Sequence, residues 1–161
     1  MTLNDLASIA IIVQGLFFIV SIGLLWYQLR ENTKLIRAGN TQKLVELSVP
    51  FYLQLAQDRA LTELWSQATY HFEDMDEIDR SRYFNMLTWW LTLHESIYHQ
   101  WRNKLIDRET YNSWTRDLEY FANTQKLATY WPRLNGFFEV SFSQHVSAIL
   151  ARQAAEGAVT E

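Results

Sequence analysis

The hydrophobic pattern of the chain begins with a long run that carries no charge. Residues 6–29 contain no Asp, Glu, Lys, Arg or His, and most of them are apolar. A helix rises about 1.5 Å per residue, so this run would extend roughly 36 Å, enough to cross a hydrocarbon core of about 30 Å. The pattern predicts a transmembrane helix at residues 6–29, preceded by a short extracytoplasmic tail at residues 1–5.

The run is more typical of an uncleaved anchor than of a secretory signal peptide. A signal peptide has a basic start, a shorter apolar stretch and a small-x-small cleavage site. Here the first five residues lack Lys and Arg, and Trp26 and Tyr27 close the run with rings suited to the membrane interface. A buried core helix is the alternative, but core helices seldom run so far without a charge.

Basic residues follow the span and predict its orientation. Arg30, Lys34 and Arg37 lie directly after residue 29, and Lys43 comes next. The positive-inside rule then places the N-terminus outside and the following domain in the cytoplasm of a bacterial inner membrane. Arg30, Lys34 and Arg37 are expected to contact lipid headgroups. Four basic residues give a modest bias, so the reversed orientation stays open.

Polar and small residues form a stripe within the span. Gln14, Ser21 and Gln28 recur every seven residues, and Gly15 and Gly23 add small side chains beside them. Small residues allow membrane helices to approach closely, and an amide can hydrogen-bond across the interface. These five residues are candidates for helix packing, in a homo-oligomer or against the span of another subunit. A single-pass helix that tolerates a lone Gln is an equally good interpretation.

The rest of the chain has the pattern of an all-α protein. Five Gly and two Pro leave little material for turns, and apolar residues recur at helical spacing. A helical stalk is expected at 30–49, ending or kinking at Pro50. A compact bundle of about four helices is expected at 50–155, with a flexible tail at 156–161. The helices are expected at 51–71, 77–105, 108–123 and 141–155, with a short piece at 124–131; Asp76 or Asp79 would cap the second, Asp107 the third, and Ser141 with Gln144 the last.

Composition excludes several classes of chemistry. The chain has no Cys, which excludes disulfides, zinc thiolate sites and a cysteine nucleophile. Its net charge of −4 is a poor electrostatic match for nucleic acid. His94 and His99 are five residues apart, which puts them on different sides of a helix and disfavours a zinc site. No phosphate-binding Gly-rich loop or nucleophile elbow occurs, so no catalytic residue, metal or cofactor is predicted.

An aromatic group on the helices expected at 77–105 and 108–123 is the remaining candidate site. His94, Glu95, Tyr98, Trp101 and Trp114 could line a small pocket, in which Glu95 would satisfy the polar tip of a buried ring. Aromatic stripes at helical spacing are more often core, and that interpretation is favoured here.

The chain also resembles a widespread group of uncharacterised bacterial membrane proteins with an N-terminal span and a helical cytoplasmic domain. The matching residues are Gln-Leu-Arg-Glu-Asn-Thr at 28–33, then Glu95, Tyr98, Gln100, Trp101, Lys104 and Leu105, and then Trp114. Lys104 stands where such relatives would carry Gly, which suggests that the helix continues further here. The resemblance implies a fold and no activity.

Three functions follow as hypotheses. The first is a non-enzymatic, membrane-tethered helical interaction module, which is a homo-oligomer or is accessory to a membrane complex. The second is an oligomeric pore lined by Gln14, Ser21 and Gln28. The third is a small-ligand sensor or enzyme that uses the region of His94, Glu95 and Tyr98.

Overall fold

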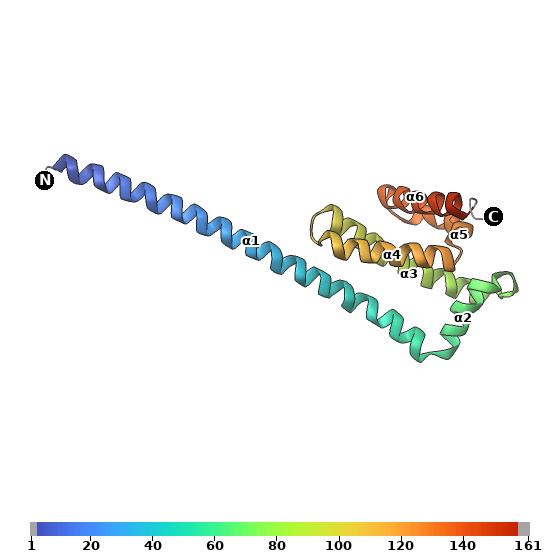
Figure 1. Cartoon of the computed structure of the whole chain (residues 1–161). Coiled ribbons are helices and arrows are strands. Elements are labelled where there is room, and N and C mark those ends of the chain that lie inside the picture. The colour runs from blue at the N-terminus through green and yellow to red at the C-terminus, as the bar shows by residue number, and fades with distance from the viewer. Residues whose placement is uncertain (1–2, 158–161) are drawn as a thin grey trace. The chain divides into compact units, whose positions relative to one another are not determined.

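The computed structural model describes the backbone of residues 3–157 and the side chains of residues 11–156. The described residues form α-helices and short 3-10 helices without a strand, which confirms the expectation of an all-α chain. Of the expected tails, residues 1–2 and 158–161 lie outside the described part, and residues 3–5 and 156–157 are helical. The elements are α1 (Leu3–Gln57), α2 (Arg59–Tyr70), η1 (Phe72–Asp74), α3 (Glu77–Arg102), α4 (Arg108–Thr124), α5 (Leu127–Leu134), η2 (Asn135–Phe137) and α6 (Val140–Gly157) (Figure 1).

The chain divides into an N-terminal unit that ends at Gly39 and a C-terminal unit that begins at Asn40. In the N-terminal unit every apolar side chain from residue 11 to residue 29 is exposed. The helix that contains them is long and apolar enough to cross a membrane, and a stretch of 18 residues in it has a mean hydropathy of 1.8. The C-terminal unit contains the end of α1 and all of α2 to α6.

Helix α1 continues through Pro50 to Gln57, so the helix does not end at Pro50, and the alternative expectation of a kink there stays a prediction. Proline removes one helical N–H donor, which leaves the carbonyl of Glu46 without its usual partner. Glu46 is exposed, so water can replace that donor. Leu44, Ser48 and Phe51 are buried along one side of the same stretch, and this packing offsets the cost of the proline. The expected helix at 51–71 is therefore two helices, the end of α1 and α2.

A single residue separates these two helices. Asp58 has extended backbone angles, and its carboxylate accepts a hydrogen bond from the Leu61 amide at 3.1 Å. The Thr62 hydroxyl donates to the Leu55 carbonyl across the same corner. These bonds satisfy a free carbonyl at the end of α1 and a free amide at the start of α2, so the chain turns from one helix into the other without a loop.

Helices α3 and α4 have the expected starts, but α3 ends earlier than expected. Asp76 and Asp107 accept hydrogen bonds from the third residue of their helices, each at 2.8 Å. Helix α3 stops at Arg102, and Lys104 takes a left-handed conformation with φ of 59°. The Leu105 amide then donates to the Gln100 carbonyl at 2.8 Å. This bond caps the C-terminal end of the helix, in an arrangement where the left-handed residue is usually glycine. The expectation that Lys104 prolongs the helix is therefore wrong.

Helices α5 and α6 also differ in detail from the expected pattern. Pro132 lies inside α5 rather than after it, in a helix of only eight residues. Helix α6 begins at Val140, and the carboxylate of Glu139 accepts from the Ser141 amide and hydroxyl. Ser141 therefore lies inside the first turn, and Glu139 takes the capping role expected of Ser141 with Gln144.

The core of the C-terminal unit surrounds α3. Helix α3 packs against α2 and α4, and α4 packs against α5 and α6; α3 and α4 are joined by a short turn (Figure 1). The buried face of α3 includes Tyr83, Leu87, Trp90 and Leu91. Trp101, in the last turn of this helix, is exposed. Residues from the other helices complete this core: Leu64, Ala68, Leu118, Ala122, Leu127, Tyr130, Phe142 and Val146.

Candidate functional site

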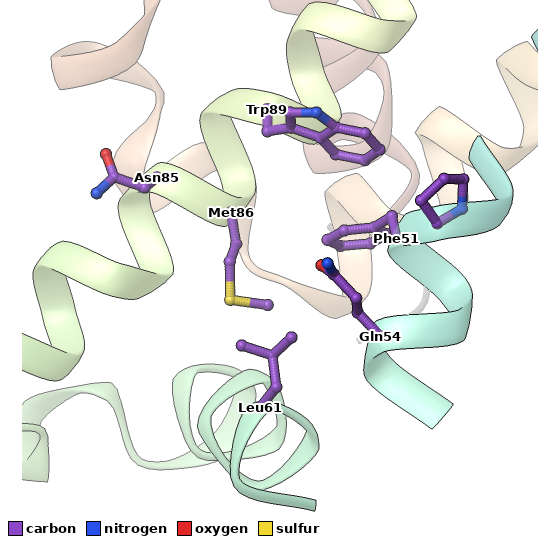
Figure 2. A pocket seen from close by; sticks show the side chains of 7 residues that line it. Phe51, Gln54, Leu61, Asn85, Met86 and Trp89 are labelled. Carbon is purple, nitrogen blue, oxygen red and sulfur yellow. The ribbon is translucent and has the colours of Figure 1, made fainter. Parts of the chain in front are cut away.

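An apolar groove opens where the end of α1, α2 and α3 meet. Its volume is about 370 Å³, within the range of sites that hold a small molecule or a few side chains of a partner. Figure 2 shows Phe51 and Gln54 of α1, Leu61 of α2, and Asn85, Met86 and Trp89 of α3 around the opening. Pro50 of α1 also lines the groove.

The groove has one rigid aromatic wall. The rings of Phe51 and Trp89 stack with centroids 5.0 Å apart and an interplanar angle of 25°. Phe51 is buried, whereas Trp89 remains 42% exposed and presents the rest of its indole to solvent. Met86 and Leu61 form the facing wall. An exposed Trp beside a flexible Met is typical of surfaces that bind apolar side chains.

None of the seven lining residues is charged. The polar groups in the lining are the side-chain amides of Gln54 and Asn85. An amide can donate and accept hydrogen bonds, so these two can pair with a peptide backbone or with a neutral polar group. A charged ligand would lose its hydration here without gaining a partner of opposite charge. The groove therefore suits an uncharged, mainly apolar ligand.

The corner at Asp58 creates this groove. Because α2 follows α1 after one residue, Leu61 in the first turn of α2 is brought to the side of α1 that carries Phe51 and Gln54. Pro50 contributes a flat ring at the rim and has no N–H to satisfy. The groove thus depends on local features of residues 50–61 and on the register of α3.

The predicted aromatic group around His94 is packed rather than open. His94, Tyr98 and Trp114 meet Tyr111, His145 and Phe142 around a cavity of about 10 Å³, which has room for about one water molecule. Glu95 and Trp101 do not line this cavity. Trp101 instead stacks on Tyr111 with centroids 4.2 Å apart. The structure therefore brings three of the five residues together, as core.

The buried His94 contacts a carboxylate. Its Nε2 atom lies 3.2 Å from Oδ2 of Asp117, although the approach is poorly aligned for a hydrogen bond. Burial lowers the pKa of His94, and the nearby Asp117 opposes that shift only in part. The Tyr52 hydroxyl lies 3.5 Å from both oxygens of Asp117, and burial together with this carboxylate raises its pKa to about 12. Neutral His94 and neutral Tyr52 therefore flank one carboxylate that links α1, α3 and α4.

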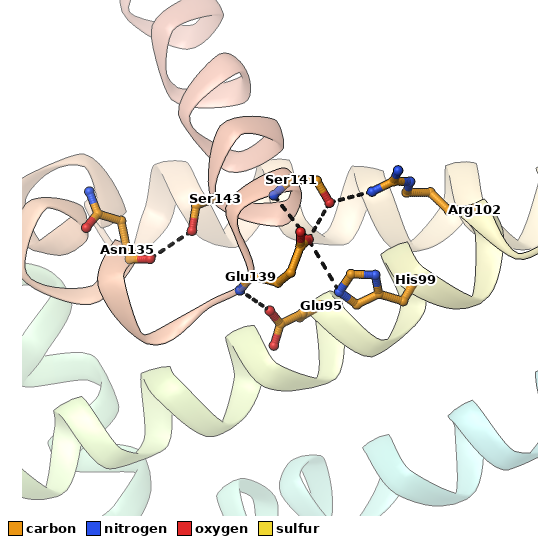
Figure 3. A network of polar contacts seen from close by, with 7 residues as sticks. All are labelled: Glu95, His99, Arg102, Asn135, Glu139, Ser141 and Ser143. Carbon is orange, nitrogen blue, oxygen red and sulfur yellow. Dashed lines mark hydrogen bonds and ion pairs between the residues drawn. The ribbon is translucent and has the colours of Figure 1, made fainter.

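Glu95 holds the start of α6. Its carboxylate accepts a hydrogen bond from the Glu139 amide at 2.6 Å. Figure 3 shows the network around it: Arg102 donates to the Ser141 hydroxyl at 2.5 Å, and His99 lies 3.8 Å from the Glu139 carboxylate. Two hydrogen bonds from Ser141 lower the pKa of Glu139; the bond from the hydroxyl has the larger effect and the bond from the amide the smaller. Ser143 also donates to the Asn135 carbonyl at 2.8 Å, which closes the turn before α6. These contacts join α3 to the start of α6, so the network serves to hold α6 in place.

The predicted packing residues of the span lie on its exposed surface. Gln14, Gly15 and Ser21 line one shallow hollow, and Gly23 and Gln28 lie outside its lining. A Cβ atom added at Gly15 or Gly23 would meet nothing within 4 Å, so both positions are open to an approaching helix. The Ser21 hydroxyl donates to the Phe17 carbonyl at 2.8 Å and is satisfied within its own helix.

The predicted headgroup residues have different surroundings. The guanidinium of Arg30 lies 5.6 Å from the ring centre of Trp26, an arrangement suited to the membrane interface. Lys34 pairs with Glu31 at 2.6 Å, which reduces the local excess of positive charge. Arg37 is half-buried and also makes an interaction.

The side chains that line the groove were not predicted as a site from the sequence. Phe51, Leu61, Met86 and Trp89 come from three segments, and each fits its own helical pattern. One signal was available: Trp89 lies off the buried stripe of its helix, where a large aromatic side chain is not expected. Within the described residues no cluster of His, Asp and Glu could hold a metal ion. No family model, no curated protein and no solved structure matches the chain.

Proposed function

We propose that the chain is a membrane-tethered, non-enzymatic interaction module whose helical unit docks an apolar segment of a partner protein. The uncharged groove between α1, α2 and α3, with the half-exposed Trp89 beside Phe51, is the observation that carries this proposal. Trp is enriched among the residues that dominate binding energy at interfaces, and flexible Met side chains are common on surfaces that adapt to apolar partners.

The N-terminal half of α1 would serve as the anchor. Its apolar side chains from residue 11 to residue 29 are exposed, and its composition suits a lipid environment. We place the N-terminus outside and the helical unit in the cytoplasm, since Arg30, Lys34, Arg37 and Lys43 all follow the span. The residues after the span would form a stalk that leads into a compact bundle.

The proposed occupant is an apolar peptide segment of another subunit at the same membrane. The amides of Gln54 and Asn85 can pair with its backbone, and the apolar walls can accept its side chains. A tether confines the search to proteins at one membrane surface and raises the effective concentration of each partner. A weak groove can therefore suffice for stable association.

Neither alternative hypothesis has a structural observation in its favour. The cavity at His94 and Tyr98 holds about 10 Å³, which is too small for a metabolite. A pore would need Gln14, Ser21 and Gln28 to face a water path, and the Ser21 hydroxyl already bonds to its own helix.

Site-specific photo-crosslinking tests the proposal in native membranes. A photoreactive phenylalanine analogue replaces Trp89 in the full chain, and in the control it replaces Tyr120, an exposed aromatic residue on α4 away from the groove. We expect a discrete protein adduct from position 89 and none from position 120. The adduct should fall at least tenfold when Met86→Glu places a charge in the groove.

Other results would contradict the proposal. Equal adducts from both positions would show general surface contact, and a lipid adduct at position 89 would identify an acyl chain as the ligand. An adduct that persists unchanged in Met86→Glu would place the contact outside the groove.

A further inference from the structure

One face of the last part of α1 is apolar and exposed. Between residues 40 and 57, Leu44, Ser48 and Phe51 are buried against the other helices of the C-terminal unit. Val45 and Val49 lie on a different side of the helix and are exposed, as is Tyr52, whose hydroxyl contacts Asp117. Leu47 and Leu53 of the same stretch are exposed as well. Exposed β-branched side chains at this spacing are unusual on a helix that already has a buried side.

These exposed residues follow a heptad pattern. Gln42, Val45, Val49 and Tyr52 are spaced three, four and three residues apart, as in the contact seam of a coiled coil. Counting back from Gln42 in steps of seven gives Leu35, Gln28, Ser21 and Gln14. The polar stripe of the span and the exposed face of the C-terminal unit therefore share one register in the sequence of a single helix.

A second copy of the chain fits this pattern better than an unlike partner. Copies anchored by the same N-terminal segment are parallel and at equal depth, so each residue on the seam meets its own counterpart. Gln14, Gln28 and Gln42 recur every fourteen residues, and an amide can both donate to and accept from an identical amide. Such polar residues at seam positions fix the register of paired helices.

Charge gives no competing explanation for this face. Gln42, Val45, Val49 and Tyr52 are uncharged, and the neighbouring Lys43 pairs with Glu46 at 3.4 Å. An anionic lipid surface would call for unpaired basic residues among the apolar ones. Two carboxylates lie beside this face, and each accepts a hydrogen bond from a seam side chain of its own chain: Glu46 from Gln42 at 3.1 Å and Asp117 from Tyr52 at 3.5 Å.

We infer that the chain self-associates as a parallel pair through the α1 seam, defined as Gln42, Val45, Val49 and Tyr52. The seam shares no residue with the groove that Pro50, Phe51, Gln54, Leu61, Asn85, Met86 and Trp89 line. A pair would thus keep two free grooves, and a partner with two apolar segments would bind with higher avidity than one with a single segment. This inference stands independently of the proposed docking function.

Disulfide trapping tests the seam directly, because the natural chain contains no Cys. The full chain carries one cysteine in its native membrane, either at Gln42→Cys on the seam or at Lys43→Cys beside it. We expect rapid crosslinking of two copies at position 42 and at least tenfold less at position 43, since only the seam position brings two Cα atoms within disulfide reach. Equal crosslinking at both positions, or none at position 42, would overturn the inference.

A charge placed on the seam gives a second readout. Val49→Glu sets like charges against each other in a symmetric pair, whereas Leu47→Glu puts the same charge off the seam at a residue of nearly equal exposure, 44% against 42%. In mild detergent we expect wild type and Leu47→Glu to have the mass of a dimer, and Val49→Glu to dissociate at least tenfold more readily. A monomeric wild type, or a Val49→Glu chain that remains dimeric, would refute the seam. The photo-adduct at position 89 does not depend on this mass, so the two proposals can fail separately.

Discussion

Leu44 provides the sharpest test of how the end of α1 joins the C-terminal unit. Its side chain is 0% exposed and packs with Leu93 and Ile97 of α3 and with Ile106 from the turn before α4. Leu44 lies six residues before Pro50, in the part of the helix that the sequence pattern assigns to a stalk. If the contact exists, a change at Leu44 destabilises the whole helical unit.

The magnitude follows from the burial of this side chain. Leu44→Ala removes a fully buried side chain and leaves a cavity among three apolar neighbours, a change that typically costs about 2–5 kcal/mol. The sequence neighbour Leu47 is 44% exposed and has no place in this cluster, so Leu47→Ala should cost less than about 1 kcal/mol. Two Leu→Ala changes three residues apart in one helix therefore predict different free energies of unfolding.

Urea unfolding in mild detergent, followed by near-ultraviolet circular dichroism, measures both free energies. Trp114 borders the Leu44 cluster, so its signal reports on that packing. We expect a lower urea midpoint for Leu44→Ala and a nearly unchanged one for Leu47→Ala. Equal midpoints for the two variants would refute the packing of α1 against α3 and return residues 40–49 to a free stalk.

Two further predictions concern a helix cap and the dependence of stability on pH. Asp107→Ala should lower the free energy of unfolding by about 1 kcal/mol, because the Thr110 amide loses its acceptor, whereas Asp107→Asn should keep most of the bond; equal losses in urea unfolding would contradict this. Burial lowers the pKa of His94, so the unfolded chain takes up its proton first as the pH falls. Stability should then decrease below about pH 6.5, by up to roughly 1.4 kcal/mol per pH unit for this one group. The decrease should be shallower in His94→Gln than in wild type, and identical pH profiles of thermal unfolding would show that His94 is not buried as a neutral group.

The sequence was sufficient for features that depend on local patterns. Asp76 or Asp79, and Asp107, were expected as caps because they lie at the starts of helical patterns, and the structure gives the cap to Asp76 and to Asp107. Pro50 does not end α1, because burial of Leu44 and Phe51 on either side of it offsets the local cost of the proline. The expectation that Lys104 prolongs α3 was wrong for a related reason. The hydrogen bond from the Leu105 amide to the Gln100 carbonyl allows a lysine to take the left-handed conformation that favours glycine.

Features that join distant segments could not be predicted in the same way. Glu95 was interpreted as the partner of a buried ring, but its carboxylate binds the Glu139 amide, forty-four residues away in the chain. His94, Tyr98 and Trp114 do come together, yet the rings of Tyr111 and Phe142 and the imidazole of His145 fill the space that a ligand would need. A sequence reveals which aromatic side chains share a helical face, and only the packing of other helices decides whether that face encloses a pocket.

The groove is the opposite case, because residues that the sequence does not single out come together to form an open site. Phe51, Leu61 and Trp89 each look like ordinary helix positions, and their convergence depends on the one-residue corner at Asp58. The apolar surface left open there differs from the exposed apolar surface of residues 11–29, because Gln54 and Asn85 supply hydrogen-bonding groups that lipid does not use. We therefore propose different surroundings for these two surfaces, a bilayer for residues 11–29 and a peptide segment for the groove.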